Sequence, residues 1–265
     1  MSKALAWYHF GMDVAFYLPG RVPVYTFSLL IAIASALGLF WVAKDAPEKK
    51  LQAGFSAGIW ALFGAAIVGR SAFVAIHWGH FQDHPLEIPQ IWLGGMSGSG
   101  ALAGAILTIM LIAIISKNNL AELSDDLIPL LTAITVSAWL GCWVNGCLYG
   151  TEVQAWWGIP ARDEWGEIAT RWPLQPAGAL LTLLIAWGVD QARGRGWLPS
   201  PGLAAALEVG CIALTLLWAA SFRADPVPQW RNLGLDTWAA LGLIVILILT
   251  TVWVVCFEQV EKFRK

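Results

Sequence analysis

The sequence predicts an all-α integral membrane protein of about seven transmembrane helices around a lipid-accessible polar cavity. Of its 265 residues, 58% are hydrophobic and only 13% are charged, whereas typical soluble proteins have about 25% charged residues. Apolar stretches of roughly 20 residues, the length that crosses a bilayer core, recur near 24–43, 53–78, 91–116, 127–149, 174–189, 202–222 and 235–257. We therefore expect residues 1–265 to form one transmembrane domain.

Each of these stretches is expected to be helical, because backbone groups in lipid need hydrogen-bond partners within their own segment. The fifth stretch is short, and it follows Pro173 and contains Pro176, which suit a first helical turn. No cleavable signal peptide is expected, since the first twenty residues carry Asp13 and Pro19 instead of a basic region followed by an apolar one.

The placement of lysine and arginine predicts an N-terminus outside and a C-terminus in the cytoplasm. The turn Lys44–Lys50 is compactly basic, whereas segment 79–90 has no lysine or arginine. With this orientation the inner segments hold Lys44, Lys49, Lys50, Lys117, Arg193, Arg195, Lys262, Arg264 and Lys265, and the outer ones hold Lys3, Arg21, Arg162, Arg171, Arg223 and Arg231.

The longest outer loop, residues 150–173, is rich in tryptophan. One interpretation is an aromatic belt at the level of the lipid headgroups. The other is a rim on the periplasmic side that admits substrate from the outer leaflet. The tryptophans are Trp156, Trp157, Trp165 and Trp172.

Arg70 is the most informative single residue, because apolar residues flank it on both sides within the second stretch. An arginine inside a span is costly unless it is paired or faces water, so it is a candidate for a functional site. Its guanidinium matches phosphate bidentately, which in a membrane indicates a phospholipid headgroup. The alternative is an arginine that snorkels or is structurally paired.

Glycines open the third stretch, in the segment Trp92–Gly104. They allow the backbone to approach either another helix or a ligand closely. Helix packing explains Gly100 and Gly104, which are four residues apart, better than it explains the pair Gly94–Gly95.

The fourth stretch ends in the segment Gly141–Gly150, where Asn145 needs a hydrogen-bond partner from another helix or a substrate. Cys142 and Cys147 would lie about 140° apart on a regular helix and would not share a face. A metal pair is therefore not expected there, and a catalytic cysteine is less favoured than a small buried apolar side chain. A secreted disulfide framework is not expected either, because all four cysteines of the chain fall in or near apolar runs.

Other polar groups give weaker signals. Glu208 in the sixth stretch needs a partner or a proton, which the sequence does not identify. His80 and His84 have helical ligand spacing but lie in a loop broken by Pro85, so we expect solvated histidines and no metal. No cofactor is expected. Nucleic acid is not expected as a partner, because no basic cluster is present.

Several short blocks, in order, resemble prolipoprotein diacylglyceryl transferases. The resemblance covers about residues 25–225, and each block is short. The blocks are Gly69-Arg70, Gly94–Ser97, Asp125, Asn145–Gly150, Trp157-Gly158, Arg171–Gln175 and Phe222–Asp225.

The resemblance implies a reaction in the bacterial cytoplasmic (inner) membrane. Members of this family move the diacylglyceryl group of phosphatidylglycerol onto the thiol of a lipobox cysteine in a prolipoprotein, a step of lipoprotein biosynthesis. Such an enzyme must bind the headgroup phosphate, deprotonate the thiol and admit lipid. The implied partners are phosphatidylglycerol and prolipoprotein signal peptides.

The departures from the family pattern fall on its polar groups. They remove candidate bases and a nearby cation, so whether the chain is an active enzyme is left open. The replacements are Ser99 and Trp172 for histidines, Trp139 and Thr151 for arginines, Cys147 and Ala220 for glutamates, and Ala177-Gly178 for a Tyr-Glu pair.

Three hypotheses follow: an active transferase with rearranged catalytic groups, a non-catalytic relative that binds anionic lipid or serves as a subunit, and an unrelated transporter. The single intramembrane arginine and the lack of an internal repeat argue against the transporter. No catalytic residue is assigned. The expected lipid-binding residues are Arg70, Asn145, Gly95, Ser97, Ser99, Tyr25 and Gln175.

Overall fold

The computed structural model describes residues 13–19, 22–45, 48–91 and 94–248. Helices occur at all of the predicted apolar stretches, which confirms the all-α membrane class. They are α2 (Thr26–Asp45), α3 (Glu48–Ile76), α5 (Gly98–Ser116), α7 (Ile128–Asn145), α8 (Leu174–Gly194), α9 (Leu203–Ala220) and an apolar helix at Leu235–Ile248.

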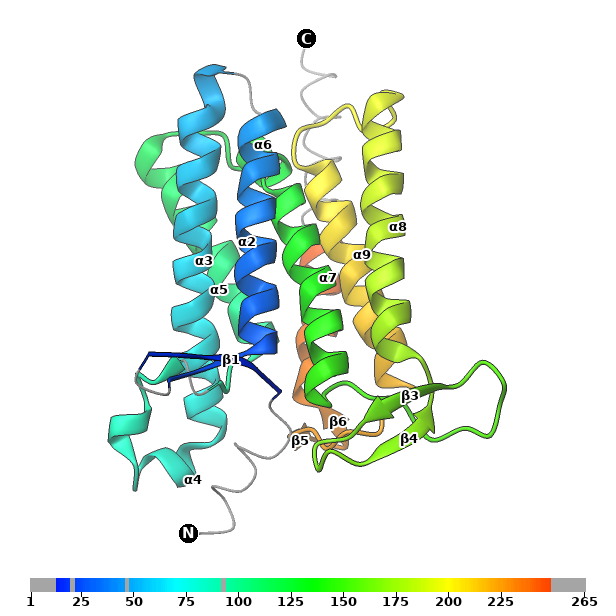
Figure 1. Ribbon diagram of the computed structural model, residues 1–265. Coiled ribbons are helices and arrows are strands. Elements are labelled where there is room, and N and C mark those ends of the chain that lie inside the picture. The colour runs from blue at the N-terminus through cyan, green and yellow to red at the C-terminus, as the bar shows by residue number, and fades with distance from the viewer. Residues whose placement is uncertain (1–12, 20–21, 46–47, 92–93, 249–265) are drawn as a thin grey trace.

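Within the described residues, five helices are long and apolar enough to cross a membrane, namely α2, α3, α5, α7 and α9. Helix α8 has 21 residues and runs beside α7 and α9 (Figure 1). The rest of the seventh predicted stretch lies outside the described residues. The total number of spans and their orientation stay predictions.

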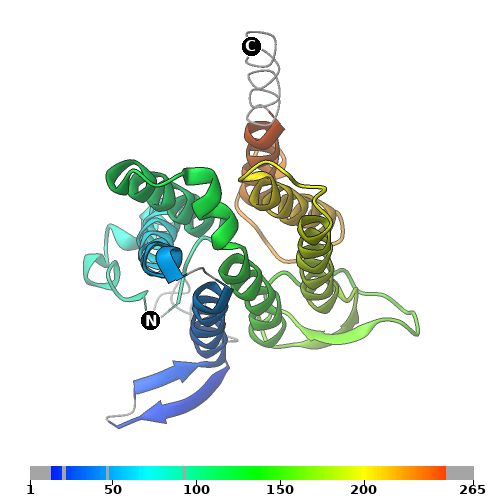
Figure 2. The ribbon, with the colours of Figure 1, turned by 90° about the horizontal axis from the view of Figure 1, so that it is seen from above.

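The helices form a curved arrangement when viewed along their axes. Helices α2 and α7 pack along each other in the middle, with α3 and α5 on one side and α8 and α9 on the other (Figure 2). Their outward faces carry large exposed apolar side chains, which suits contact with lipid rather than water. Examples are Phe40, Trp60, Ile67, Ile114, Leu180 and Trp187.

Glycines set the closest helix contact, between α3 and α5. A Cβ added at Gly104 would lie 2.3 Å from the Gly64 carbonyl oxygen, and one at Gly100 would lie 2.7 Å from the Ala72 Cβ. Small residues that let backbones approach are typical of membrane helix interfaces. The packing role predicted for Gly100 and Gly104 is confirmed.

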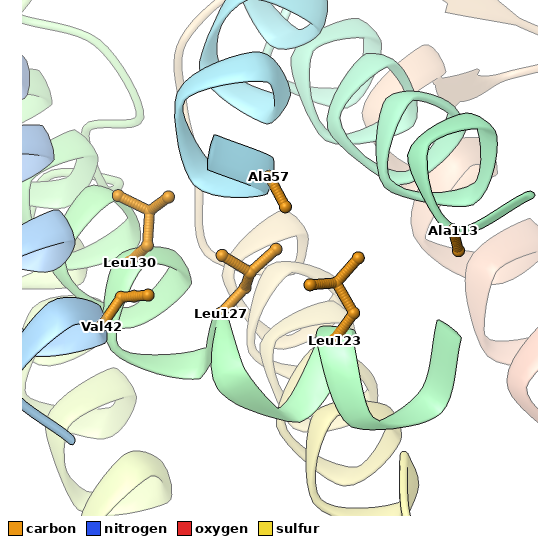
Figure 3. Close-up of a cluster of buried hydrophobic side chains, with 6 residues drawn as sticks. All are labelled: Val42, Ala57, Ala113, Leu123, Leu127 and Leu130. Carbon is orange, nitrogen blue, oxygen red and sulfur yellow. The ribbon is translucent and has the colours of Figure 1, made fainter. Parts of the chain in front are cut away.

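At one end of the helices the short helix α6 (Leu120–Asp126) closes an apolar core. Leu123 and Leu127 lie between side chains of the surrounding helices (Figure 3). The buried members of this core are Val42, Ala57, Ala113, Leu123, Leu127 and Leu130.

Two acidic residues near the same end have structural partners. The carboxylate of Asp125 accepts from the Gly202 and Ala205 N–H groups at 2.8 and 2.9 Å and thereby caps the start of α9. Glu208, fully buried in α9, accepts a hydrogen bond from the Thr132 hydroxyl of α7. Thr132 is the partner that the sequence did not identify.

The opposite end, which we call the hairpin end, gathers the short strands and small helices (Figure 1). It contains the two-stranded antiparallel sheets β1–β2 (Val14–Leu18, Val22–Tyr25), β3–β4 (Ile159–Arg162, Ile168–Arg171) and β5–β6 (Gln229–Trp230, Leu233–Gly234), with α4 (Trp78–Phe81) and the 3-10 turn η1 (Pro85–Glu87). Every segment predicted to lie outside, within the described residues, is at this end.

Candidate functional site

Three of the short sequence blocks meet at the hairpin end. The Thr151 N–H donates to the Phe222 carbonyl and the Ala224 N–H to the Tyr149 carbonyl, both at 2.9 Å. The Trp172 N–H donates to the Thr151 carbonyl, also at 2.9 Å. These bonds join residues 147–153, 171–175 and 222–225 into one platform beyond the ends of α7, α8 and α9.

Arg223 holds one side of this platform through carboxylates. Its Nε and Nη2 donate to the two oxygens of Asp225 at 2.8 and 2.6 Å, which is a bidentate pair, and Nη1 donates to Asp236 at 3.3 Å. Asp225 also accepts from the Leu148 N–H at 3.3 Å. Arg223 is therefore linked directly to the segment that follows α7.

Arg171, which is 6% exposed, lies on the other side. Its Nη2 lies 3.3 Å from Glu152 and 3.4 Å from Asp163, and its guanidinium carbon lies 4.6 Å from the centre of the Tyr149 ring. Among the described residues, the buried Nε of Arg171 has no hydrogen-bond partner. A buried donor without a partner is costly, so an acceptor supplied by a ligand would stabilise this site.

Tyr149 connects these groups to the β3–β4 hairpin. Its hydroxyl donates to the Glu164 carboxylate. Burial raises the pKa of the Tyr149 hydroxyl, and the nearby Glu164 raises this pKa further. The hydroxyl therefore remains a hydrogen-bond donor at neutral pH.

Cys142 and Cys147 form a disulfide, with Cα atoms 4.6 Å apart. The prediction that they do not share a face is wrong, because it assumed a regular helix through residue 147. Helix α7 ends at Asn145, and Gly146, with φ of 70°, reverses the chain so that the Cys147 N–H donates to the Cys142 carbonyl at 3.0 Å. A Cβ at Gly146 would lie 2.2 Å from the Asp163 carbonyl oxygen, so the turn also fits against the hairpin.

Gln175 and Asn145, both predicted site residues, lie beside this disulfide. Gln175 is fully buried in the first turn of α8, and its Nε2 donates to the Cys147 carbonyl at 3.0 Å. Gln175 Oε1 and Asn145 Oδ1 are buried acceptors without a partner among the described residues. Two amide oxygens near the disulfide are thus left as acceptors, which suit hydroxyl or N–H donors.

Two of the departures from the family pattern touch each other. Trp139 packs against Gly178, where an added Cβ would lie 2.4 Å from the indole ring. The resemblance places an arginine at position 139 and a glutamate at position 178. The large ring fills the space that the glycine leaves, so an apolar contact stands where the family has charged side chains.

Four other predicted residues, Arg70, Gly95, Ser97 and Ser99, lie around the end of α3. Arg70 is 6% exposed and donates to four backbone carbonyls: Nε to Ile88 at 2.9 Å, Nη1 to Gly94 and Gly95 at 2.7 and 2.8 Å, and Nη2 to Glu87 at 2.7 Å. These bonds fix segment 87–95 against α3. The structure thus gives Arg70 a structural role, while its role as a phosphate ligand stays a prediction.

Gly95, Ser97 and Ser99 complete this second region. Gly95 has φ of 77°, and a Cβ there would lie 2.6 Å from the Phe73 ring. The Ser97 hydroxyl caps α5 by accepting from the Gly100 N–H at 3.2 Å, and it lies 3.1 Å from the Ser99 hydroxyl. These three residues shape the entry to α5, and their lipid-binding role is likewise a prediction.

A groove with a volume of about 600 Å³ runs beside this end of α3. Arg70 lines it together with apolar residues, whereas Asn145 is not among the lining residues. The walls formed by Phe63, Ile67 and Trp78 are exposed on the outside of the helices, so the groove is accessible to lipid.

Tyr25 lies at the end of β2, directly before α2, and is buried. Phe27, two residues later, packs against α7: a Cβ at Gly141 would lie 2.5 Å from its ring. The start of α2, which follows Tyr25, therefore packs against α7.

The predicted residues therefore fall into two groups, and the richer site contains residues that were not singled out. The prediction missed the roles of Arg171, Arg223 and Tyr149, although all three stand within the short blocks quoted above. Their signal was a charged or phenolic group in a loop directly beyond an apolar stretch. Hydropathy identifies only the apolar stretch itself, so it does not single out a polar residue just outside that stretch.

Known proteins match this chain over most of its length. The sequence model of the family described as prolipoprotein diacylglyceryl transferase matches residues 13–255. A phosphatidylglycerol–prolipoprotein diacylglyceryl transferase of Cupriavidus metallidurans is 25% identical over 221 residues, which are 80% of this chain and 77% of that relative.

Relatives with the same name occur in other bacteria. That of Thermosynechococcus vestitus is 23% identical and matches 83% of this chain and 100% of its own length. That of Neisseria meningitidis serogroup C is 30% identical over 177 residues, or 64% of this chain and 57% of the relative. With the family match spanning nearly the whole sequence, this chain belongs to the prolipoprotein diacylglyceryl transferase family.

Proposed function

We propose that the protein transfers the diacylglyceryl group of phosphatidylglycerol to the cysteine thiol of a prolipoprotein, in a bacterial cytoplasmic membrane. The observation that carries this proposal is the meeting of three family blocks at the hairpin end. They bring Arg171, Arg223 and Gln175 onto one platform, and Asn145 lies two residues before Cys147, to which Gln175 is bonded.

The hydrogen-bonding groups that lack partners match the headgroup of phosphatidylglycerol. The buried Nε of Arg171 is a donor suited to a phosphate oxygen. The buried oxygens of Asn145 and Gln175 are acceptors suited to the hydroxyls of a glycerol headgroup. A choline headgroup offers no such hydroxyls, so these groups favour phosphatidylglycerol over phosphatidylcholine.

In the proposed reaction the substrate sulfur forms a bond to the glyceryl carbon of the lipid. The bond from that carbon to the phosphate oxygen breaks, and glycerol phosphate leaves with the electron pair. Guanidinium groups stabilise a phosphate that gains charge, because they donate to it bidentately. Arg223 and Arg171 would serve this role by exchanging carboxylate partners for phosphate.

The test uses the purified full chain in vesicles with a peptide that carries a single lipobox-type cysteine. We expect mass spectrometry to detect the diacylglyceryl thioether in phosphatidylglycerol vesicles. We expect none in phosphatidylcholine vesicles or with the serine form of the peptide. Expression of the chain should also restore lipoprotein maturation in cells depleted of their own transferase.

A second candidate is a non-catalytic lipid-binding relative. It is favoured by the contact of Trp139 with Gly178, which replaces charged family positions, and by the carboxylate partners of both arginines. This candidate predicts selective retention of phosphatidylglycerol without any thioether product. That result, with no rescue in depleted cells, would overturn the transferase proposal.

A further inference from the structure

The Cys142–Cys147 disulfide lies inside the candidate site. The carbonyl of Cys147 accepts from Gln175, and Asn145 lies between the two cysteines in the turn. The next residue, Leu148, donates its N–H to Asp225, the partner of Arg223. The disulfide is therefore linked through the backbone of residues 145–148 to Asn145, to Gln175 and to the Asp225–Arg223 ion pair.

The two sulfurs differ in their accessibility. Cys142 is 8% exposed within α7, whereas Cys147 is only partly buried beyond the end of the helix. Thiol–disulfide exchange depends on which sulfur a thiolate can reach. An incoming thiolate would attack Cys147 Sγ, and Cys142 Sγ would be the leaving group.

The predicted orientation places this end of the helices outside the cytoplasm, where disulfides form and persist. The proposed acceptor of the lipid group is also a cysteine thiol that reaches the site from this side. A disulfide and a substrate thiol would therefore meet in one place.

Resting on the proposed function, we infer that the Cys142–Cys147 disulfide is a thiol-exchange site that captures the acceptor cysteine of a peptide substrate and returns it as a thiolate. In the capture step the substrate thiol loses its proton to water and attacks Cys147 Sγ. The internal disulfide breaks, a mixed disulfide forms, and Cys142 leaves as a thiolate.

In the return step the Cys142 thiolate attacks Cys147 Sγ. The internal disulfide forms again, and the substrate sulfur leaves with its electron pair as a thiolate. The two steps together neither oxidise nor reduce any group, so no external oxidant or reductant is needed. The released thiolate lies beside the platform of Arg171 and Arg223.

This chemistry fills a gap in the sequence. Cys147 stands where the resemblance places a glutamate, and Ser99 and Trp172 stand where it places histidines. A general base helps by removing a proton during the reaction. The proton passes to water during capture, so a thiolate that leaves the mixed disulfide meets the lipid already deprotonated, and deprotonation and transfer become separate steps.

The first experiment looks for the mixed disulfide. The full chain, with Cys211 and Cys256 replaced by serine, is incubated in phosphatidylglycerol vesicles with an excess of a single-cysteine peptide. After an acid quench, non-reducing mass spectrometry should find one peptide adduct on Cys147 that reduction removes. Because the Cys142 thiolate would otherwise release the peptide, N-ethylmaleimide is added shortly before the quench to block that thiol. A pair that still carries no adduct would overturn the inference.

Single variants separate capture from return. The Cys142→Ser variant is loaded with the peptide as its 2-thiopyridyl disulfide. It should hold the peptide stably, because no resolving thiolate is present. The parent chain, loaded in the same way after reduction of the pair, should release the peptide and restore the internal disulfide. Equal retention by both would contradict the return step, and Cys147→Ser should take up no peptide.

The transfer assay distinguishes failure of this inference from failure of the proposed function. The double variant Cys142→Ala/Cys147→Ala should lose transfer by about 10²-fold or more, the scale of a lost general base, while still retaining phosphatidylglycerol. Unchanged transfer would overturn the exchange site and leave the transferase intact. Adduct formation without any transfer by the parent chain would overturn the transferase instead. If the double variant does not fold, the adduct on the parent chain decides.

Discussion

Two regions of the molecule bury an arginine to the same extent but satisfy it differently. Arg70, within α3, donates to four backbone carbonyls of segment 87–95. Arg171, the last residue of β4, faces the carboxylates of Asp163 and Glu152 and keeps one buried N–H without a partner among the described residues. Both arginines are 6% exposed.

The difference separates a structural arginine from a candidate ligand. Carbonyls are fixed parts of the chain, so a guanidinium bound to them organises a loop. Carboxylate side chains can move away, and a phosphate could then accept two hydrogen bonds from the guanidinium. An arginine in an apolar stretch is therefore an incomplete signal of function, because backbone carbonyls can accept most of its hydrogen bonds.

The largest expected effect is on the hairpin-end platform. Arg223→Ala should lower the rate of thioether formation by about 10²- to 10³-fold, because a cation that stabilises the leaving phosphate is lost. Arg223→Lys should recover part of that rate, because lysine keeps the positive charge but cannot donate two parallel hydrogen bonds as a guanidinium does. The rate is measured per folded protein. The control is Arg195→Ala, because Arg195 is exposed at the other end of the helices. Equal rates of thioether formation in Arg195→Ala and Arg223→Ala would mean that the site lies elsewhere.

Substitutions of Arg70 test whether this arginine is structural. Arg70→Ala should reduce the free energy of unfolding by about 3 kcal/mol, because buried carbonyls lose their donors. Arg70→Lys should restore only part of this stability. Unfolding in detergent measures both variants. The ratio of affinities for phosphatidylglycerol and phosphatidylcholine should stay unchanged in Arg70→Lys, and a selective loss of phosphatidylglycerol would instead support the lipid-binding role predicted from the sequence.

The turn after α7 gives a smaller effect with a distinct readout. Gly146→Ala should destabilise the fold by about 1–3 kcal/mol, because φ is positive there and a Cβ would meet the Asp163 carbonyl. Labelling with a thiol reagent should also find more free Cys142 and Cys147. Gly79→Ala, where a Cβ would meet nothing within 4 Å, should change neither stability nor labelling. Similar labelling of the two variants would show that the turn does not hold the cysteines together.

The smallest effect concerns Tyr149. The pKa of the Tyr149 hydroxyl is raised in the folded state. The stabilising contribution of Tyr149 is therefore full below about pH 10, the ordinary pKa of tyrosine. It is lost as the pH rises further, because the unfolded chain then releases a proton that the folded chain keeps. Tyr149→Phe should cost about 1 kcal/mol at neutral pH through the lost hydrogen bond to Glu164. Unfolding measured between pH 7 and 11 should show this difference shrinking on the alkaline side. A constant difference would mean that Tyr149 titrates normally.

The sequence predicted the positions of the membrane helices well, because the length and hydropathy of each stretch follow from the thickness of a bilayer. It also predicted the close packing at Gly100 and Gly104, since small residues four apart lie on one face of a helix. Helix geometry is local, so these features needed no knowledge of the rest of the fold.

The candidate site was predicted only in part. Asn145 and Gln175 were found because each is polar at the edge of an apolar stretch. The partners of Arg70 could not be found, since the loop that supplies them lies 17 to 25 residues away and is bound through backbone atoms of residues of any type.

The sequence by itself determined that this chain lies in a membrane, where its helices run and which short blocks relate it to a family. Only the tertiary structure decided that Cys142 and Cys147 pair, that Trp139 fills the space over Gly178, and that Arg171 and Arg223 share a platform. The physical reason is that hydropathy and periodicity depend only on which residues of a segment contact lipid, water or the protein interior. Pairing instead depends on where chain reversals such as Gly146 place groups that are distant on a helix or in sequence.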